Sequence, residues 1–171
     1  GWLGEHGQPG NPQVRCMPNT PALVGLGMTG LFALPGASQA DRDLAATLLR
    51  SVGEVVWVDD DAGLDAVTAL SGSGPAYVFL FLEALMAGGK AVGLNEEQSR
   101  QLALATFAGA TRLATQSDEP PSVLRERVTS MGGTTAAALG EFEQGGFAPL
   151  VERAMQAAAR RSRELAEEFG K

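Results

Sequence analysis

The first third of the chain alternates between short apolar runs and one amphipathic stretch. Residues 54–58 are β-branched and aromatic, a composition typical of a strand. Residues 41–52 place apolar side chains on one face at helical spacing, and Ser38 or Asp41 is a suitable N-cap. The pattern predicts strands at 13–17, 30–34 and 54–58 and a helix at 41–52, after a helix end and a Gly/Pro loop at 1–12. This order is typical of the later part of an α/β sheet.

Beyond Asp61 the strand signals stop and the apolar pattern becomes helical. Small residues and a proline at 71–75 should kink the long apolar run in which they lie. Asn95, followed by acids and then Gln98, is typical of a helix start. The predicted helices cover 62–92, about 96–116, 120–128, 135–144 and 147–169. Residues 62–171 are therefore predicted to be nearly all α, and the chain as a whole mostly α.

One part of the long helix is apolar on every side. Residues 78–82 read Val-Phe-Leu-Phe-Leu, and small residues are dense from Ala84 to Ala91. A helix that is apolar all round needs cover on all sides. We favour an intertwined homodimer in which the partner supplies this cover, because closed homodimers are the commonest oligomers. The alternative is that a preceding part of a longer protein covers it.

Composition excludes several classes of function. A formal charge of −7 makes the chain a poor ligand for nucleic acid, because it repels phosphate. One cysteine, Cys16, and one histidine, His6, cannot form an intrachain disulfide or the usual zinc site, so we expect no metal. Cys16 is interpreted as a small core residue. The two long uncharged stretches are broken by prolines and by residues 71–75, so neither is interpreted as a membrane span.

The most informative segment is 129–139, which places two glycines and two hydroxyls at the start of an Ala-rich helix. Backbone N–H groups at a helix start lack intrahelical acceptors, and the helix dipole adds positive charge there. Gly132 and Gly133 allow the backbone to close around a carboxylate or phosphate. The simpler interpretation is a Gly-Gly turn followed by a threonine N-cap.

Two further segments shift the balance from a simple capped turn toward a binding site. Residues 71–77, Ser-Gly-Ser-Gly-Pro-Ala-Tyr, interrupt a helix, although the kink could serve packing alone. Residues 14–22 read as a short strand that stops at two prolines, with a stiff polar loop at Asn19 and Thr20. Ligands in open α/β sheets collect at the carboxyl ends of strands. An ordinary Pro-rich turn is the alternative for this segment.

The three segments, in this order, resemble the pyrroline-5-carboxylate reductase family, whose members make proline. The family's C-terminal part carries a Met-Pro-Asn-Thr-Pro stretch, then Ser-Gly-Ser-Gly-Pro-Ala-Tyr, then a stretch of the Ser-Pro-Gly-Gly-Thr-Thr type. Here these are residues 17–21, 71–77 and 130–135, and the resemblance runs from about Pro12 to about Glu164. Met131 stands where the family motif usually has proline, which leaves the loop less rigid.

The resemblance implies reduction of 1-pyrroline-5-carboxylate to L-proline by hydride transfer from NADPH or NADH. It also implies that residues 1–61 are the C-terminal part of a dinucleotide-binding α/β domain of the Rossmann type, and that 62–171 are an all-α dimerisation and substrate-binding domain. The enzyme is then expected to be cytoplasmic, a homodimer or a larger homo-oligomer, and without a nucleic-acid or membrane partner.

Each motif receives a role from this resemblance. Thr135 is the catalytic candidate: a hydroxyl is a weak acid, so it orients the imine or relays a proton from water. The substrate carboxylate is assigned to the N–H groups of Gly132, Gly133 and Thr134, helped by Ser130. A wall of the cleft is assigned to Ser71, Gly72, Ser73, Gly74 and Pro75, and contact with the nicotinamide side of the cofactor to Asn19, Thr20 and Pro21.

Three other functional interpretations of the sequence are possible. Gly25, Gly27 and Gly30 match G-x-G-x-x-G, but no strand precedes them and no helix opens from them, so a phosphate role is rejected. A β-hydroxyacid dehydrogenase would need a lysine in the long helix with an asparagine one turn beyond; Asn95 follows Lys90 at the wrong spacing. The chain, which we expect to be the C-terminal portion of a longer protein, could also be an inactive dimerisation module when isolated from the cofactor domain.

Overall fold

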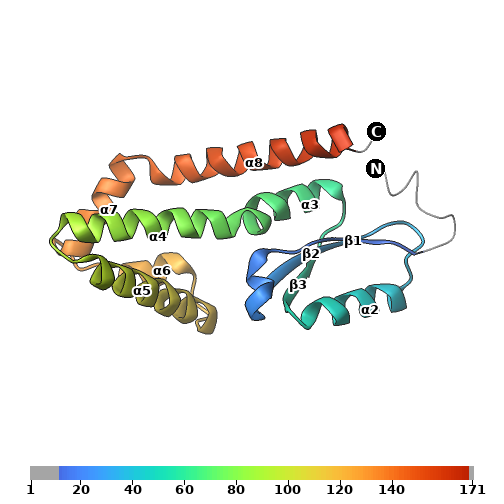
Figure 1. Cartoon of the computed structure of the whole chain (residues 1–171), viewed down its shortest axis with the longest axis horizontal. Coiled ribbons are helices and arrows are strands. Elements are labelled where there is room, and N and C mark those ends of the chain that lie inside the picture. The colour runs from blue at the N-terminus through green and yellow to red at the C-terminus, as the bar shows by residue number, and fades with distance from the viewer. Residues whose placement is uncertain (1–11, 170–171) are drawn as a thin grey trace. The chain divides into compact units, whose positions relative to one another are not determined.

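The computed structural model describes residues 12–169, which form two compact units (Figure 1). The first, here called the sheet unit, comprises residues up to Tyr77 and from Glu152 onward; the second, here called the helical unit, comprises Val78–Val151. Helices α4 (Gly74–Ala91) and α8 (Phe147–Phe169) contribute residues to both. The predicted helix end and loop at 1–12, with His6, lies almost wholly outside the described residues.

The sheet unit is built on three strands in the order β1-β2-β3. Strand β1 (Val14–Met17) pairs antiparallel with β2 (Gly27–Ala33), and β2 pairs parallel with β3 (Gly53–Trp57). A 3-10 helix, η1 (Thr20–Val24), joins the first two strands, and α2 (Gln39–Arg50) joins the parallel pair. The carboxyl end of β1 therefore meets the amino end of β2, because the two strands run in opposite directions.

The core of the sheet unit lies around its central strand. Thr29 and Leu31 of β2 are fully buried, and Ala46 of α2 is also buried. Figure 1 shows α2 on one side of the strands and α3 (Asp61–Val67) on the other. The second face depends on close packing: a Cβ at Gly30 would lie 2.6 Å from a methyl group of Val67. Alternate residues of β2 thus contact helices on opposite faces.

Helix starts in the sheet unit follow local capping rules. The hydroxyl of Ser38 accepts from the backbone N–H of Asp41, whose carboxylate accepts from the backbone N–H of Ser38. Hydrogen bonds from the Ser38 side chain and backbone hold the pKa of the Asp41 carboxyl below its usual range. Asp60 caps α3 in the same manner through the N–H of Gly63 at 2.7 Å. These caps fix where the helices begin.

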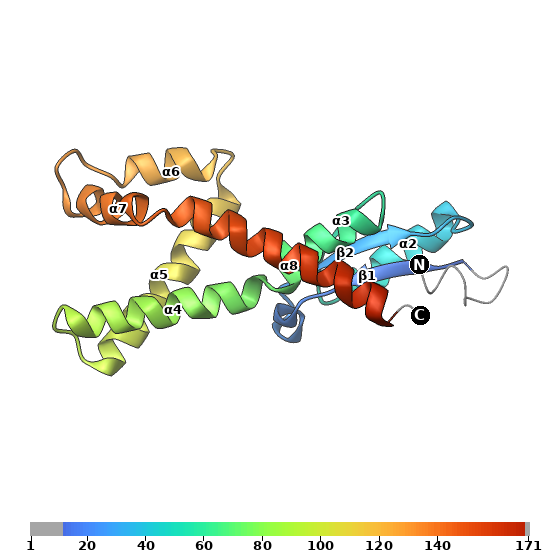
Figure 2. The same cartoon turned by 90° about the horizontal axis from the view of Figure 1, so that it is seen from above.

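The helical unit contains most of α4 and the helices α5 (Glu96–Gln116), α6 (Pro121–Arg127) and α7 (Thr134–Gln144). Asn95 and Gln98 form the capping box that begins α5. An aromatic cluster joins α4, α5, α7 and α8: the ring of Phe81 lies 5.6 Å from Phe107 and about 6 Å from Phe142 and Phe147. Figure 2 shows α6 and α7, which flank the Gly-Gly turn.

The predicted helix at 62–92 is divided in the structure. Between α3 and α4 lies a π-helical turn, η2 (Thr68–Gly72), so the interruption falls where the sequence predicts a kink. The second strand begins at Gly27, three residues before the prediction, and the glycines of the rejected G-x-G-x-x-G match lie in or just before it. The predicted domain boundary between residues 61 and 62 stays a prediction; the two compact units divide the chain elsewhere.

Candidate functional site

The Met-Pro-Asn-Thr-Pro segment lies where β1 ends. Strand β1 stops at Met17, and Asn19 is the extended N-cap residue of η1, with Pro21 inside its first turn. The strand register places Met17 opposite Gly30, so continuing it brings Asn19 opposite Met28. The segment is therefore a short, stiff connection at a sheet edge, with the Thr20 side chain exposed to solvent.

The side chain of Asn19 is held by the protein itself. Its Oδ1 accepts from the backbone N–H of Met28 at 2.9 Å. Its Nδ2 donates to the carbonyl of Ser71 at 3.2 Å and to the hydroxyl of Ser71 at 3.1 Å. The structure thus brings together two of the three sequence motifs, Asn19 from the first and Ser71 from the second, which are 52 residues apart.

The Ser-Gly-Ser-Gly-Pro segment is a helix interruption. Ser73 donates its N–H to the carbonyl of Thr68 at 2.8 Å, the i→i+5 bond of a π-turn, and α4 restarts at Gly74. A Cβ at Gly72 would lie 2.5 Å from the terminal methyl of Met17, so this turn lies directly against β1. Single π-turns of this kind are frequent at functional sites. Residues 71–75 are half-buried.

The Gly-Gly segment forms a tight turn at the start of α7. Gly133 donates its N–H to the carbonyl of Ser130 at 3.0 Å, and Gly132 has φ +69°. Because no described non-glycine residue has positive φ, this is a type II turn with Met131 and Gly132 at its centre. Gly133 is the N-cap and has no side-chain cap hydrogen bond. The threonine N-cap alternative is therefore wrong, since Thr134 is already the first helical residue.

The turn leaves an exposed set of donors. The backbone N–H groups of the first helical turn, from Thr134 onward, have no acceptor within the helix. The side chains of Ser130, Thr134 and Thr135 are exposed. The N–H of Gly133, in contrast, is used inside the turn. This segment belongs to the helical unit, whereas Asn19 and residues 71–75 belong to the sheet unit, and their assignment to one site stays a prediction.

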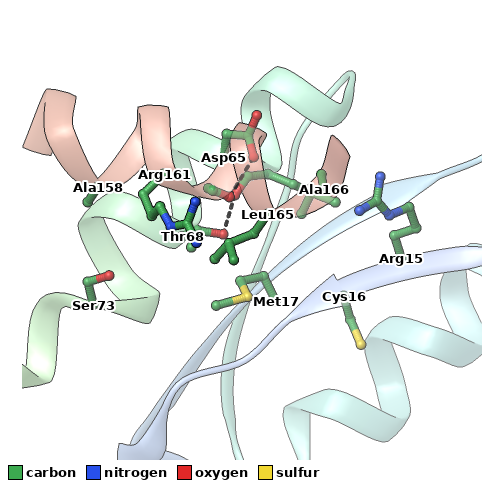
Figure 3. Close-up of a pocket in the computed structure, with 12 residues that line it drawn as sticks. Arg15, Cys16, Met17, Asp65, Thr68, Ser73, Ala158, Arg161, Leu165 and Ala166 are labelled. Carbon is green, nitrogen blue, oxygen red and sulfur yellow. Dashed lines mark hydrogen bonds between the residues drawn. The ribbon is translucent and has the colours of Figure 1, made fainter. Parts of the chain in front are cut away.

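A pocket of about 390 Å³ in the sheet unit lies beside the second motif (Figure 3). Ser162 of α8 donates to the carboxylate of Asp65 at 2.6 Å, and Arg161 pairs with Glu164 and Glu168. The hydrogen bond to Glu168, then that to Glu164, raises the pKa of the Arg161 guanidinium. The pocket is lined by Arg15, Cys16, Met17, Leu64, Asp65, Thr68, Ser73, Ala158, Arg161, Ser162, Leu165 and Ala166.

Sequence reasoning missed this pocket. The exposed side chains of Arg161 and Glu164 form an i,i+3 ion pair on α8. No short motif connects Asp65 with Ser162, because they are 97 residues apart. The interpretation of Cys16 as a core residue is wrong: its side chain is exposed, on the opposite side of β1 from Met17 (Figure 3). Successive side chains of a strand point to opposite faces, so the Cys16 and Met17 side chains point in opposite directions although both residues line the pocket.

A second pocket, of about 610 Å³, lies in the helical unit. Three phenylalanines line it, and so does Thr129, one residue before the type II turn. It is lined by Phe81, Arg125, Glu126, Thr129, Leu139, Phe142, Glu143, Phe147 and Ala148. Among residues 12–169, no group of three or more His, Cys, Asp or Glu side chains is placed to hold a metal ion.

Comparison with known proteins gives one consistent result. Residues 61–165 match the family model described as pyrroline-5-carboxylate reductase dimerisation. The pyrroline-5-carboxylate reductase of Pseudomonas aeruginosa is 50% identical over 169 residues, which are 99% of this chain and 60% of that protein. That of Haemophilus influenzae is 48% identical over 153 residues, 89% of this chain and 56% of that protein.

Comparison with solved structures gives the same family. The reductase of Coxiella burnetii superposes with a TM-score of 0.89 at 41% identity, over 92% of this chain and 58% of that one. The pyrroline carboxylate reductase of Plasmodium falciparum, solved with NADP bound, superposes with a TM-score of 0.87 at 34% identity. The match covers 95% of this chain and 65% of that one. The chain thus spans about three fifths of the length of its relatives. The predicted combination of a Rossmann-type sheet remnant and a helical region is confirmed by these likenesses.

Proposed function

Since the chain belongs to the pyrroline-5-carboxylate reductase family, we propose that the protein containing it reduces 1-pyrroline-5-carboxylate to L-proline with NADPH or NADH. The observation that carries this proposal is the exposed type II turn at the start of α7, inside the segment that the family model matches. Such a turn offers backbone and hydroxyl donors to a small carboxylate.

The donor set of the first two motifs fits the uncharged end of a nicotinamide cofactor. Thr20 offers an exposed hydroxyl beside Pro21, and residues 71–75 offer a half-buried wall without a charged side chain. When bound, the cofactor supplies the hydride. The NADP in the Plasmodium falciparum relative supports NADP(H) as a cofactor for this family member as well. The chain's own task is to hold the ring and the substrate in alignment.

The substrate carboxylate is assigned to the turn that begins α7. Ser130 supplies a hydroxyl, and Gly132 and Thr134 supply N–H groups. Gly133, also assigned to the carboxylate on the basis of the sequence, uses its N–H for the carbonyl of Ser130, so its contribution is to shape the turn. The positive end of the α7 dipole adds to the attraction for a carboxylate.

Thr135 is the proposed catalytic residue. It is the second residue of α7, one position beyond Thr134, and its side chain is exposed on the same helix start. A hydroxyl there can orient the imine nitrogen or relay a proton from water to it. No cysteine or histidine is needed for this reaction, which is consistent with a chain that has one of each.

Self-association is proposed through the helical unit, which lies within residues 61–165, the segment that matches the dimerisation model. The run 61–91 is long and apolar enough, by length and composition alone, to cross a membrane, and little of it is buried in the described chain. Its place inside the matched dimerisation region favours subunit contact as the use of this surface. We therefore propose a homodimer or larger homo-oligomer in the cytoplasm, which sedimentation and cell fractionation would test.

The proposal is tested by measuring NADPH and NADH oxidation that depends on 1-pyrroline-5-carboxylate, with the full-length protein and this 171-residue chain side by side. Turnover by the full-length protein only is expected. Absence of turnover with either cofactor would overturn the reductase and favour the second candidate, an interaction module. Turnover by the isolated chain would contradict the view that it is inactive without a cofactor domain.

A variant tests the role of Thr135. In the full-length enzyme, Thr135→Ala is expected to lower kcat/KM by roughly tenfold to a hundredfold, about 1.4–2.7 kcal/mol. Thr111→Ala is the matched control, because its hydroxyl donates to the carbonyl of Phe107 inside α5. An unchanged kcat/KM for Thr135→Ala would remove this residue from the mechanism.

A further inference from the structure

The contacts of Asn19 point to a role that differs from direct contact with a cofactor. We propose that Asn19 is a positioning residue: it fixes the direction of the Ser71 hydroxyl, so that the Ser71 proton is presented to an acceptor oxygen of the bound ligand. This inference rests on the proposed function, because it assigns the ligand of the same site. Asn19 contacts three neighbouring groups in the sheet unit: the Met28 N–H, the Ser71 carbonyl and the Ser71 hydroxyl.

The orientation of the Asn19 amide is determined by its partners. The backbone N–H of Met28 can only donate, so the atom 2.9 Å from it must be the amide oxygen. The amide nitrogen consequently faces Ser71. Because β1 and β2 run antiparallel with Met17 opposite Gly30, this contact follows directly from the strand register. Rotation of the amide by 180° would place two donors against each other at Met28.

The Ser71 carbonyl explains why an amide is needed here. In a helix this carbonyl accepts from the N–H four residues later, but residue 75 is proline and has no N–H. The Nδ2 of Asn19 donates to the Ser71 carbonyl at 3.2 Å instead. Asn19 thus replaces the hydrogen bond that Pro75 removes, and it stabilises the π-turn at the position where the helix is interrupted.

The same amide nitrogen sets the direction of the Ser71 hydroxyl. It donates to Ser71 Oγ at 3.1 Å, and an amide nitrogen cannot accept a proton in return. The hydroxyl proton must therefore point away from Asn19. Among the described residues the Ser71 hydroxyl donates to none, and the residue is only half-buried. A hydroxyl held as an acceptor on one side is a directed donor on the other.

The ligand that fits such a donor carries an exposed acceptor oxygen. In the proposed reaction two groups have one: the substrate carboxylate and the carboxamide of the nicotinamide. Asn19 is then spared from ligand contact, because both ends of its amide are already used by Met28 and Ser71. Thr20 remains the exposed polar side chain of the first motif.

The test uses Asn19→Asp, Ser71→Ala and the double variant in the full-length protein. Aspartate keeps the shape of asparagine but can only accept, so it turns the Ser71 proton toward itself and away from the ligand. Each single variant is expected to lower kcat/KM by about tenfold, the effect of one lost hydrogen bond. In the Ser71→Ala background, Asn19→Asp should add less than about twofold, because the directed proton is already absent.

Binding measurements identify the ligand oxygen. Calorimetric titration with L-proline and, separately, with NADP⁺ shows which affinity falls by about tenfold in the single variants. A fall for L-proline assigns the carboxylate, and a fall for NADP⁺ assigns the carboxamide. Ser71→Thr keeps the hydroxyl and should restore affinity. Multiplicative effects of the two variants, or unchanged affinity for both ligands, would overturn the proposal.

Failure of the proposed function would be recognised separately. If the wild-type protein neither reduces 1-pyrroline-5-carboxylate nor binds L-proline and NADP⁺, the reductase itself is wrong, and so is the ligand role of Ser71. If the wild type is active, the double variant and the two ligand affinities together decide the positioning role. Thermal unfolding of every variant distinguishes loss of fold from loss of the directed proton, and Ser71→Thr serves as the folded reference.

Discussion

The sheet unit and the helical unit differ in where their apolar side chains lie. In the sheet unit, Leu31, Ala46 and Leu64 are buried around the central strand. In the helical unit, the residues that are buried within the described chain are only Ser99 and Ala103, while Phe79, Leu80 and Leu113 are well over half exposed. The sheet unit therefore has its own core. The helical unit has a surface suited to a second copy, because apolar patches of this kind mark association sites.

The largest expected effect is on that surface. Leu80→Asp places a carboxylate on a side chain that is 66% exposed in the single chain, and burying this charge in a dimer is costly. We expect the dimer dissociation constant to rise at least about a hundredfold, measured by analytical ultracentrifugation. Leu48→Asp, on a side chain 63% exposed in α2, is the matched control and should leave the assembly unchanged. Equal rises of the dissociation constant in the two variants would show that the association surface is not confined to the helical unit.

The core of the sheet unit gives the next effect. Leu31 has no exposed surface, so Leu31→Ala is expected to lower the free energy of unfolding by about 2–5 kcal/mol, measured by urea titration. Leu23→Ala, in the exposed end of η1, should change it by about 0.5 kcal/mol or less. A small loss at Leu31 would mean that the sheet unit also depends on surroundings outside this chain.

Packing inside the helical unit is tested at one helix contact. A Cβ on Gly89 would lie 2.8 Å from the Oγ of Ser99, so Gly89→Ala is expected to cost about 1–3 kcal/mol. Ser99→Ala removes the nearest atom, a buried hydroxyl without a partner among the described residues, but keeps the Ser99 Cβ at 3.2 Å, so it should restore part of the lost stability in the double variant. Gly88→Ala is the control, since no atom lies within 4 Å of its added Cβ. Equal losses of stability at Gly88 and Gly89 would show that helix geometry, and not the contact with Ser99, determines the cost of the added methyl group.

The smallest expected effect is in the type II turn. Met131 occupies the position at which proline is favoured, and its N–H is not needed by the turn. Met131→Pro should raise the free energy of unfolding by about 0.4–1 kcal/mol, by restricting the unfolded chain. Gly132→Ala should lower it, because Gly132 has φ +69°. Chemical denaturation measures both, and a loss of stability with proline would contradict the assigned turn type.

Much of the fold could be predicted because its signals are local. Asn95 with Gln98 marks the start of α5 in four residues of sequence, and Gly145-Gly146 marks the end of α7. The start of β2 was predicted three residues late, because a strand that begins with glycine gives no apolar signal. The π-turn was predicted only as a kink, since no sequence rule distinguishes the two.

The candidate site was predicted less completely, and the reason is separation along the chain. The motif residues were identified from their types, but the pairing of Asn19 with Ser71 depends on the packing of the π-turn against β1, which only the folded chain defines. The use of the Gly133 N–H inside the turn likewise follows from φ at Gly132, which sequence permits but does not require. The sequence identifies possible hydrogen-bond donors. The backbone conformation determines which of them already have an acceptor inside the protein.

The discontinuity of the sheet unit has a consequence for synthesis. Its described residues come from two separate stretches, and the second begins only at Glu152, after the whole helical unit. During translation, the whole helical unit, Val78–Val151, is made between the strands and Ser162, which lies 97 residues after its partner Asp65. The helical unit, through which we propose self-association, is synthesised after the strands but before Ser162. Assembly can thus begin on a nascent chain whose sheet unit is still incomplete.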